Sequence, residues 1–254
     1  IDQVNDNSDA YVAWNWKANG SGSSNTNGTI TSTVSANTDA GFSIVSYTGN
    51  GTADSTIGHG LSKAPEMIIV KRRNTANGWA VYNKTLGSGD EVYLNYTQAE
   101  TSSNFWRNTP TASTFSVSSQ DYVNTSSDTY IAYVFHSVDG YSKVGSYTGN
   151  DNADGTFVYC GFKPAFVLIK NTVTSGEGFV MFNNKSDPSN VVGTYLTAYG
   201  STAEQGTAGT TSSRSIDFVS NGFKIRGNST EINDGEIHIF YAVAETPFKY
   251  SNGR

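Results

Sequence analysis

The amino-acid sequence predicts an all-β fold of two tandem antiparallel β-sandwich repeats, jelly-roll-like, with an N-terminal strand segment in front of them. Composition is the first observation behind this prediction. The chain has 26 glycines, 15 tyrosines, 13 phenylalanines and only 15% charged residues, which is typical of β-proteins with many turns. The second observation is a repeat: the phrase Ser46–Asn50 (Ser-Tyr-Thr-Gly-Asn) returns as Ser146–Asn150, and similar residues follow each copy. No stretch shows a sustained helical period.

Short apolar runs between Gly, Asn, Asp, Ser and Thr residues predict the strands of both repeats. In the first repeat we expect strands near residues 42–48, 66–73, 78–83, 91–95, 113–118 and 129–136. In the second we expect them near residues 143–148, 165–171, 178–183, 193–197, 216–219, 222–226 and 236–243. Short strands with turns at this spacing favour an antiparallel sandwich over a parallel α/β fold.

Three segments follow from this pattern: residues 1–40, residues 41–139 as the first sandwich and residues 140–254 as the second. Within the first segment, Asn19–Gly28 reads as a flexible connector. Thr29–Ala36 alternates as an amphipathic strand, and we expect it to form a hairpin with Phe42–Thr48.

The N-terminal segment Asp9–Trp16 resembles Asp128–Phe135, the last strand of the first repeat. Three interpretations stay open. The strand fills an edge of the first sandwich, or it is the stub of an upstream domain, or it is donated to a neighbouring subunit. The chain starts at Ile1 without an initiator methionine or a targeting segment, so we expect a processed chain or a piece of a longer one.

Charge and cysteine usage exclude several classes of protein. A net charge of -6 disfavours nucleic acid as a partner, because phosphates require a basic surface. No apolar run approaches the roughly 20 residues of a membrane-spanning helix. The single cysteine, Cys160, lies in an apolar stretch, and we expect a buried thiol.

Catalytic motifs are absent from the sequence, and we predict that the protein is not an enzyme. Glycoside hydrolysis needs two carboxyl groups at a defined separation. Glu231, Asp234 and Glu236 are close in sequence, but Asn233–Gly235 is a hairpin-turn signal. Asp90–Glu91 precedes a strand in the same way.

One loop carries oxygen ligands at alternate positions: Asn150, Asn152 and Asp154. This spacing suits calcium, but Gly161 stands where a full calcium loop has its bidentate glutamate. A tight polar turn is the other interpretation. No further cofactor is expected.

Carbohydrate binding needs an exposed aromatic ring and planar polar groups nearby. Trp106, Arg107 and Asn108 lie together between strands and offer such a set, while Tyr96 and Tyr199 lie in similar loops. The alternative is that Trp106 packs under its own loop.

Several phrases of the chain resemble a repeated domain of unknown function found in tail and other structural proteins of bacteriophages, especially marine ones. The phrases are Tyr11–Lys17, Gly41–Gly49, Gly58–Leu61, Lys63–Pro65, Phe135–Lys143 and Ala244–Asn252. In such proteins the repeat often follows a lectin-like sandwich domain, which would account for the N-terminal strand. The resemblance brings no catalytic residues with it, and the second copy departs from the first at His59-Gly60.

The resemblance implies a virion structural protein of the tail-fibre or surface-fibre kind, at the virion surface or otherwise extracellular. Its expected partners are copies of itself, other virion proteins and a host-surface glycan bound by exposed loops, with no nucleic acid and no membrane insertion. A capsid or tail decoration or assembly protein without a ligand is the alternative. A glycoside hydrolase or depolymerase comes third.

Overall fold

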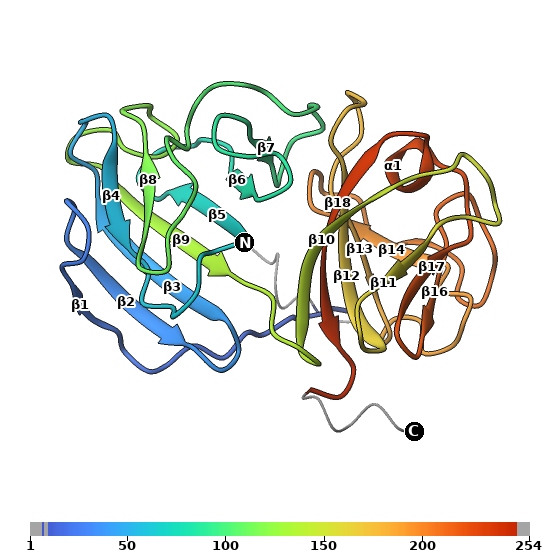
Figure 1. The fold of residues 1–254 in the computed structure, drawn as a ribbon. Coiled ribbons are helices and arrows are strands. Elements are labelled where there is room, and N and C mark those ends of the chain that lie inside the picture. The colour runs from blue at the N-terminus through green and yellow to red at the C-terminus, as the bar shows by residue number, and fades with distance from the viewer. Residues whose placement is uncertain (1–6, 8–9, 248–254) are drawn as a thin grey trace.

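The computed structural model describes residue 7 and residues 10–247, and in this part of the chain the fold is built from antiparallel sheets with one short helix (Figure 1). Figure 1 shows two lobes side by side, the first formed by β1–β9 and the second by β10–β18 and α1. The predicted all-β character is confirmed.

Each lobe contains one large and one small sheet. In spatial order, the large sheet of the first lobe consists of β1 (Ser23–Asn25), β2 (Ser32–Asn37), β3 (Phe42–Thr48), β9 (Thr129–Phe135), β5 (Met67–Arg72), β6 (Ala80–Asn83) and β7 (Val92–Tyr93). Its small sheet pairs β4 (Ser55–Gly58) with β8 (Thr114–Val117). The large sheet of the second lobe consists of β10 (Ser142–Thr148), β18 (Ile237–Ala244), β12 (Pro164–Asn171), β13 (Val180–Asn183), β14 (Thr194–Thr197) and β15 (Gln205–Gly206). Its small sheet consists of β11 (Phe157–Tyr159), β17 (Gly222–Ile225) and β16 (Ile216–Val219), and α1 (Thr230–Asn233) precedes β18.

The two lobes follow the same strand order through most of their large sheets. The run β3-β9-β5-β6-β7 in the first lobe matches β10-β18-β12-β13-β14 in the second. Strand β3 pairs with β9 from Phe42↔Phe135 to Thr48↔Thr129, and β10 pairs with β18 from Ser142↔Val243 to Thr148↔Ile237. The register of the two pairs is therefore equivalent.

Strand alternation explains how one sheet serves two cores. On β5, Ile68 and Val70 face the core inside the first lobe, while Met67 and Ile69 face a third core between the lobes. On β12, Phe166 and Leu168 likewise point into the third core. The large sheets thus pack face to face, and each is apolar on both sides.

The repeated phrase has a structural explanation. The hydroxyl groups of Tyr47 and Tyr147 are buried and donate to the carbonyl oxygens of Val123 (2.8 Å) and Ile232 (2.6 Å). A Cβ atom on Gly149 would collide with the backbone oxygen of Asp234, so only glycine fits there. In each lobe the phrase Ser-Tyr-Thr-Gly-Asn therefore holds the end of its strand, β3 or β10, against the turn that precedes the last strand, β9 or β18.

Asn124 and Asn233 complete this fastening in the two lobes. The Asn124 side chain accepts from the backbone N–H of Asn50 at 2.9 Å and donates to the carbonyl of Thr52 at 2.8 Å. The Asn233 side chain accepts from the backbone N–H of Asn150 at 3.1 Å. Both asparagines are fully buried.

The N-terminal segment differs from its predicted form. Residues 10–18 form no strand, and residues 1–6, 8 and 9 of the predicted segment lie outside the described residues, as does the closing phrase after residue 247. Trp14 packs against Phe166 (ring centroids 5.3 Å apart), and Trp16 packs against both Phe135 and Phe166. The segment lies in the apolar gap between the large sheets and not at a sheet edge, because the two indole rings bury apolar surface there.

Of three further local predictions, two are corrected and one is confirmed. The connector Asn19–Gly28 includes the short strand β1, because Ser23–Asn25 pairs with β2. The predicted hairpin turn at Asn233–Gly235 is replaced by the end of α1, whose C-cap is Asp234. Thr29–Ala36 does form a hairpin with β3, through β2. No helix in the described part of the chain is long and apolar enough to cross a membrane.

Candidate ligand-binding pocket between the lobes

The predicted Trp106–Asn108 set does not form an exposed aromatic platform. Trp106 is only 2% exposed and packs edge-on against Tyr82, with ring centroids 5.7 Å apart. Its backbone bridges Val117, so it extends the small sheet of the first lobe. The interpretation that Trp106 packs under its own loop describes the structure, and no ligand can stack on its ring in this conformation.

The neighbours of Trp106 face solvent but serve local structure. The Arg107 Nε donates to Asp54 Oδ1 at 2.7 Å, and both side chains are largely exposed. The backbone N–H of Asn108 donates to Ser116 Oγ at 2.9 Å. Neither residue lines a described pocket with Trp106.

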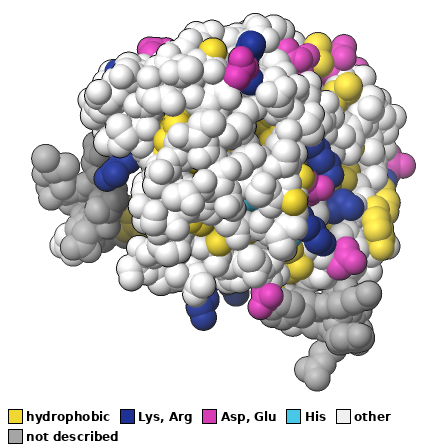
Figure 2. Space-filling view, turned by 60° about the vertical axis from the view of Figure 1, so that its left-hand side comes forward, with side chains coloured by type: hydrophobic (Ala, Val, Ile, Leu, Met, Phe, Trp, Pro, Cys, Tyr) yellow, Lys and Arg dark blue, Asp and Glu magenta, His cyan; other side chains and the backbone are white. Residues whose placement is uncertain are grey.

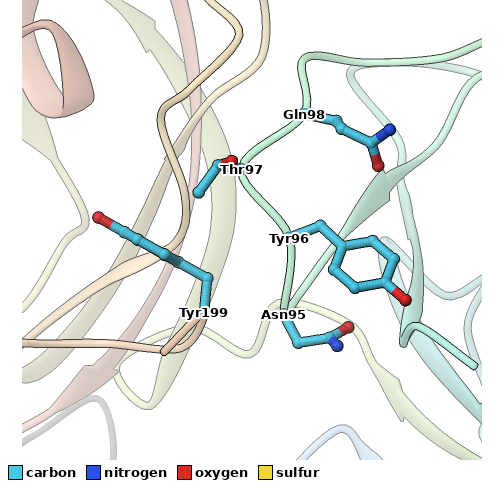
Figure 3. A pocket seen from close by; sticks show the side chains of 5 residues that line it. All are labelled: Asn95, Tyr96, Thr97, Gln98 and Tyr199. Carbon is cyan, nitrogen blue, oxygen red and sulfur yellow. The ribbon is translucent and has the colours of Figure 1, made fainter. Parts of the chain in front are cut away.

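Tyr96 and Tyr199, by contrast, line the same pocket. It has a volume of about 450 Å³, and its other lining residues are Asn95, Thr97 and Gln98 (Figure 3). Figure 3 shows the side chains of Asn95, Tyr96 and Gln98 directed to one side of their loop, while Thr97 points toward the side of Tyr199. The two tyrosine rings do not face each other, so a ligand ring would stack on one of them.

Backbone hydrogen bonds between the lobes hold this loop in place. The N–H of Gly176 donates to the carbonyl of Thr97 at 2.8 Å, and the N–H of Glu100 donates to the carbonyl of Thr172 at 2.7 Å. Asn95 Oδ1 accepts from the N–H of Trp79 at 2.8 Å. The pocket is therefore a fixed feature of the junction between the lobes.

Two glycines leave the space that the rings of the two tyrosines occupy. The Tyr96 ring lies directly over Gly78, and the Tyr199 ring lies directly over Gly178, because any Cβ at either glycine would meet the ring. Tyr96 also packs on Tyr93, with centroids 5.3 Å apart. Both rings are half-buried, and each leaves part of its surface toward solvent.

A charge pair between buried Glu231 and half-buried Arg214 lies behind Tyr199. The Tyr199 hydroxyl donates to Glu231 Oε1 at 2.5 Å, and the Arg214 guanidinium contacts Glu231 Oε2. Burial first, and then the Glu231 carboxylate, raise the pKa of Tyr199 well above its ordinary value. Tyr199 therefore stays a neutral hydrogen-bond donor, and Glu231 is held by partners instead of facing the pocket.

The other paired carboxylates also have structural roles. Glu91 is fully buried, and its Oε1 accepts from Thr101 Oγ1 at 2.6 Å and from the N–H of Ser103 at 3.0 Å. Asp234 Oδ2 accepts from Asn171 Nδ2 at 2.8 Å. None of the five described residues that line the pocket carries a carboxyl or imidazole group to act as a general acid.

The three oxygen residues proposed for calcium bond to their own loop and its neighbour. Asn150 Oδ1 accepts from the N–H of Asn152 at 3.1 Å, and Asn152 Oδ1 accepts from the N–H of Asp154 at 2.9 Å. The Asp154 carboxylate lies 2.7 Å from Lys224 Nζ. Among the described residues, no three His, Cys, Asp or Glu side chains are placed so that they could hold a metal ion.

Sequence analysis missed Asn95, Thr97 and Gln98 as lining residues. An asparagine beside a tyrosine in an inter-strand loop was a usable signal, because amides and aromatic rings are the groups that sugars need. What no local pattern contained was the meeting of residues 95–98 with Tyr199 across the two lobes. Cys160 is buried as predicted, and burial raises the pKa of its thiol to about 12.

Figure 2 shows that one face of the molecule is covered mostly by backbone and by side chains that are neither charged nor hydrophobic. Charged groups are scattered over it, apart from a group of Lys and Arg side chains near hydrophobic ones at its right-hand edge. A surface of this kind offers many hydroxyl and amide groups for polar recognition.

The fold and pocket can now be set beside known proteins. A family model described as Domain of unknown function (DUF7483) matches residues 1–247, so the match spans both lobes. The chain belongs to this family. No curated protein and no solved structure matches it significantly.

Proposed function

We propose that the protein is a structural protein of a bacteriophage virion, tail-fibre-like or surface-fibre-like, that binds a host-surface glycan in the pocket between its lobes. The observation that carries the glycan part is the pocket itself, which brings Tyr96 and Tyr199 together with the amides of Asn95 and Gln98. Its volume of about 450 Å³ is within the range of small-ligand sites. The virion part rests on the resemblance of phrases such as Tyr11–Lys17 and Phe135–Lys143 to a repeated domain of bacteriophage structural proteins.

Binding in this proposal is direct and non-catalytic. A sugar ring stacks on the Tyr96 face, while the amides of Asn95 and Gln98, on the same side of the loop, bond to its hydroxyl groups. A shallow pocket of this composition gives weak single contacts, so useful adhesion depends on many copies displayed on one particle. The protein would then act at the virion surface, beside copies of itself and other virion proteins.

The matching strand orders support a finer proposal about architecture. The two lobes are tandem copies of one jelly-roll-like sandwich unit, and the pocket arises where the copies meet. Duplication then supplies two loops, 95–98 and the one with Tyr199, that a single unit could not bring together.

Glycan-array binding of the full chain, displayed on multivalent beads, tests the proposal. Gln98 is exposed and makes no hydrogen bond to another described residue, so Gln98→Ala leaves the fold intact. We expect this variant to lose roughly tenfold in affinity, which corresponds to about 1.4 kcal/mol. Asn108→Ala is the matched control, because it removes another exposed amide of the same lobe that does not line the pocket. Equal binding by both variants, or no retained glycan, would refute the proposal.

A decoration or assembly protein without a ligand is the second candidate. The observation in its favour is the apolar edge of β11, where Phe157 is 46% and Tyr159 62% exposed. Large exposed aromatics on an edge strand are typical of surfaces that another chain covers.

A further inference from the structure

In the first lobe, a segment of the same chain covers one side, where the edges of the large and small sheets lie. Strand β2 pairs antiparallel with β3 from Ser32↔Tyr47 to Asn37↔Phe42. The residues just before β2 reach the small sheet as well, because the N–H of Ile30 donates to the carbonyl of Thr56 at 3.0 Å. Segment 29–37 therefore joins the edges of both sheets.

The second lobe has no described counterpart of this segment. Strand β10 is the last strand of its sheet and β11 the last of its own, so no described strand pairs with the outer edge of either (Figure 1). The start of β10 is partly covered, because Val138 bridges Ser142 and Ser137 Oγ accepts from the N–H of Val144 at 3.0 Å. At its other end, Thr156 Oγ1 donates to the carbonyl oxygen of Thr148 at 2.9 Å, so the uncovered part is Gly145–Tyr147.

Because the registers of the two lobes are equivalent, the contacts of segment 29–37 in the first lobe show which positions of the second lobe an added strand would contact. The pair Val34↔Val45 in the first lobe corresponds to the open position opposite Gly145. In β4, Thr56 and Gly58 carry the backbone oxygens that accept from Ile30 and Ser32. Strand β4 pairs with β8 through Ile57↔Phe115, and β11 pairs with β17 through the equivalent Val158↔Phe223. Phe157 and Tyr159 therefore correspond to Thr56 and Gly58.

The two edges also differ in their side chains. In the first lobe, a Cβ on Gly58 would collide with the side chain of Asn25 from β1. In the second lobe the residue that corresponds to Gly58 is Tyr159, whose ring is exposed. A hollow of about 250 Å³ lies beside it, lined among others by Lys143 and Cys160.

We propose that the open side of the second lobe binds a short extended strand of a protein partner, which lies antiparallel to β10 and reaches across to β11. The partner strand has the chemistry of residues 30–34: uncharged and mostly β-branched, with hydroxyl side chains between two apolar residues. Its backbone bonds to Ser146, and an apolar side chain occupies the place opposite Gly145. The charged side chain of Lys143, beside the hollow, disfavours pairing of this sheet edge with other strands.

This proposal specifies the partner of the second candidate function and rests on it; glycan binding in the other pocket is independent. The test uses the full chain and a fluorescent peptide of residues 28–35 as the probe. Hydrogen exchange locates the bound peptide. We expect saturable binding, with new amide protection in residues 145–147 and 157–159.

Variants then separate this edge from other surfaces. Phe157→Ala with Tyr159→Ala should weaken peptide binding at least about tenfold, whereas Val173→Ala, which removes another apolar side chain that is 46% exposed, should not. Glycan binding should be the same in all of them. Absence of binding, or protection at β3 in place of β10, would overturn the proposal. Concentration-dependent dimers of the unmixed chain, with β10 protected, would overturn it in favour of a second copy.

Discussion

Substitution of Asn233 by alanine gives a sharp test of how the repeated phrase stabilises each lobe. The buried Asn233 side chain accepts from the N–H of Asn150 at 3.1 Å and donates to the carbonyls of Asn152 (2.7 Å) and Gly227 (2.8 Å). Asn233→Ala removes all three hydrogen bonds and leaves three backbone groups without these partners.

The expected cost follows from where those backbone groups lie. A buried polar group that loses its partner costs about 1–3 kcal/mol, with the lower values where water can replace the bond. Asn150 and Asn152 lie in an exposed loop, whereas Gly227 is buried. We therefore expect Asn233→Ala to lower the free energy of unfolding by about 4 kcal/mol, a large share of the ~5–15 kcal/mol typical of a folded protein.

Guanidinium unfolding followed by both circular dichroism and tryptophan fluorescence is the assay. All four tryptophans, Trp14, Trp16, Trp79 and Trp106, precede the second lobe in sequence, so fluorescence reports the first lobe and the junction. Because the lobes share the core between their large sheets, the two signals should shift together.

Two matched variants complete this experiment. Asn124→Ala breaks the equivalent fastening of the first lobe and should cost a similar amount, about 3 kcal/mol. Asn108→Ala, at an exposed position, should change stability by less than about 0.5 kcal/mol. If Asn233→Ala proves as stable as Asn108→Ala, the proposed fastening does not stabilise the lobe.

Three further predictions concern pH, the junction and calcium. Burial lowers the pKa of His59 from 6.5 to about 4, with His136 adding to the effect, so the folded state holds it neutral. Its contribution is complete above pH 6.5 and falls by up to about 3 kcal/mol as the pH drops toward 4; an unchanged slope in His59→Gln would contradict this. Trp16→Ala should lower stability by about 2 kcal/mol, because the indole packs on Phe135 and Phe166, and an unchanged unfolding midpoint would show that the segment contributes nothing. Calcium or a chelator should leave the melting temperature unchanged, since the oxygens of loop Asn150–Gly155 already have partners, and a calcium-dependent rise would restore the metal site.

Strand positions could be predicted because most strands are short apolar or alternating runs bounded by turn residues. Phe42–Thr48 and Ile216–Val219 were placed at their observed bounds. Strand β4, Ser55–Gly58, was missed, since its four residues include one large apolar side chain and show no alternation. The segment before β1 was misjudged because an aromatic alternating pattern suits a gap between two sheets as well as a strand.

The site was harder to predict than the fold. Whether Trp106 is exposed depends on its bridge to Val117, which corresponds to Ile216↔Ile225 in the other lobe and is a core position. Tyr96 and Tyr199 were chosen for their aromatic rings in loops, but their common pocket exists only because the large sheets pack face to face. Local sequence carries the chemistry of each loop and not the distance between loops.

Comparison of the lobes indicates where function is to be sought. The residues that the lobes share, such as Tyr47 with Tyr147 and Asn124 with Asn233, are buried and each has a structural explanation. These residues stabilise the fold of each lobe. Function in one lobe alone requires a difference, and the clearest difference is the edge at Tyr159, which the first lobe covers with its own chain and the second leaves to solvent.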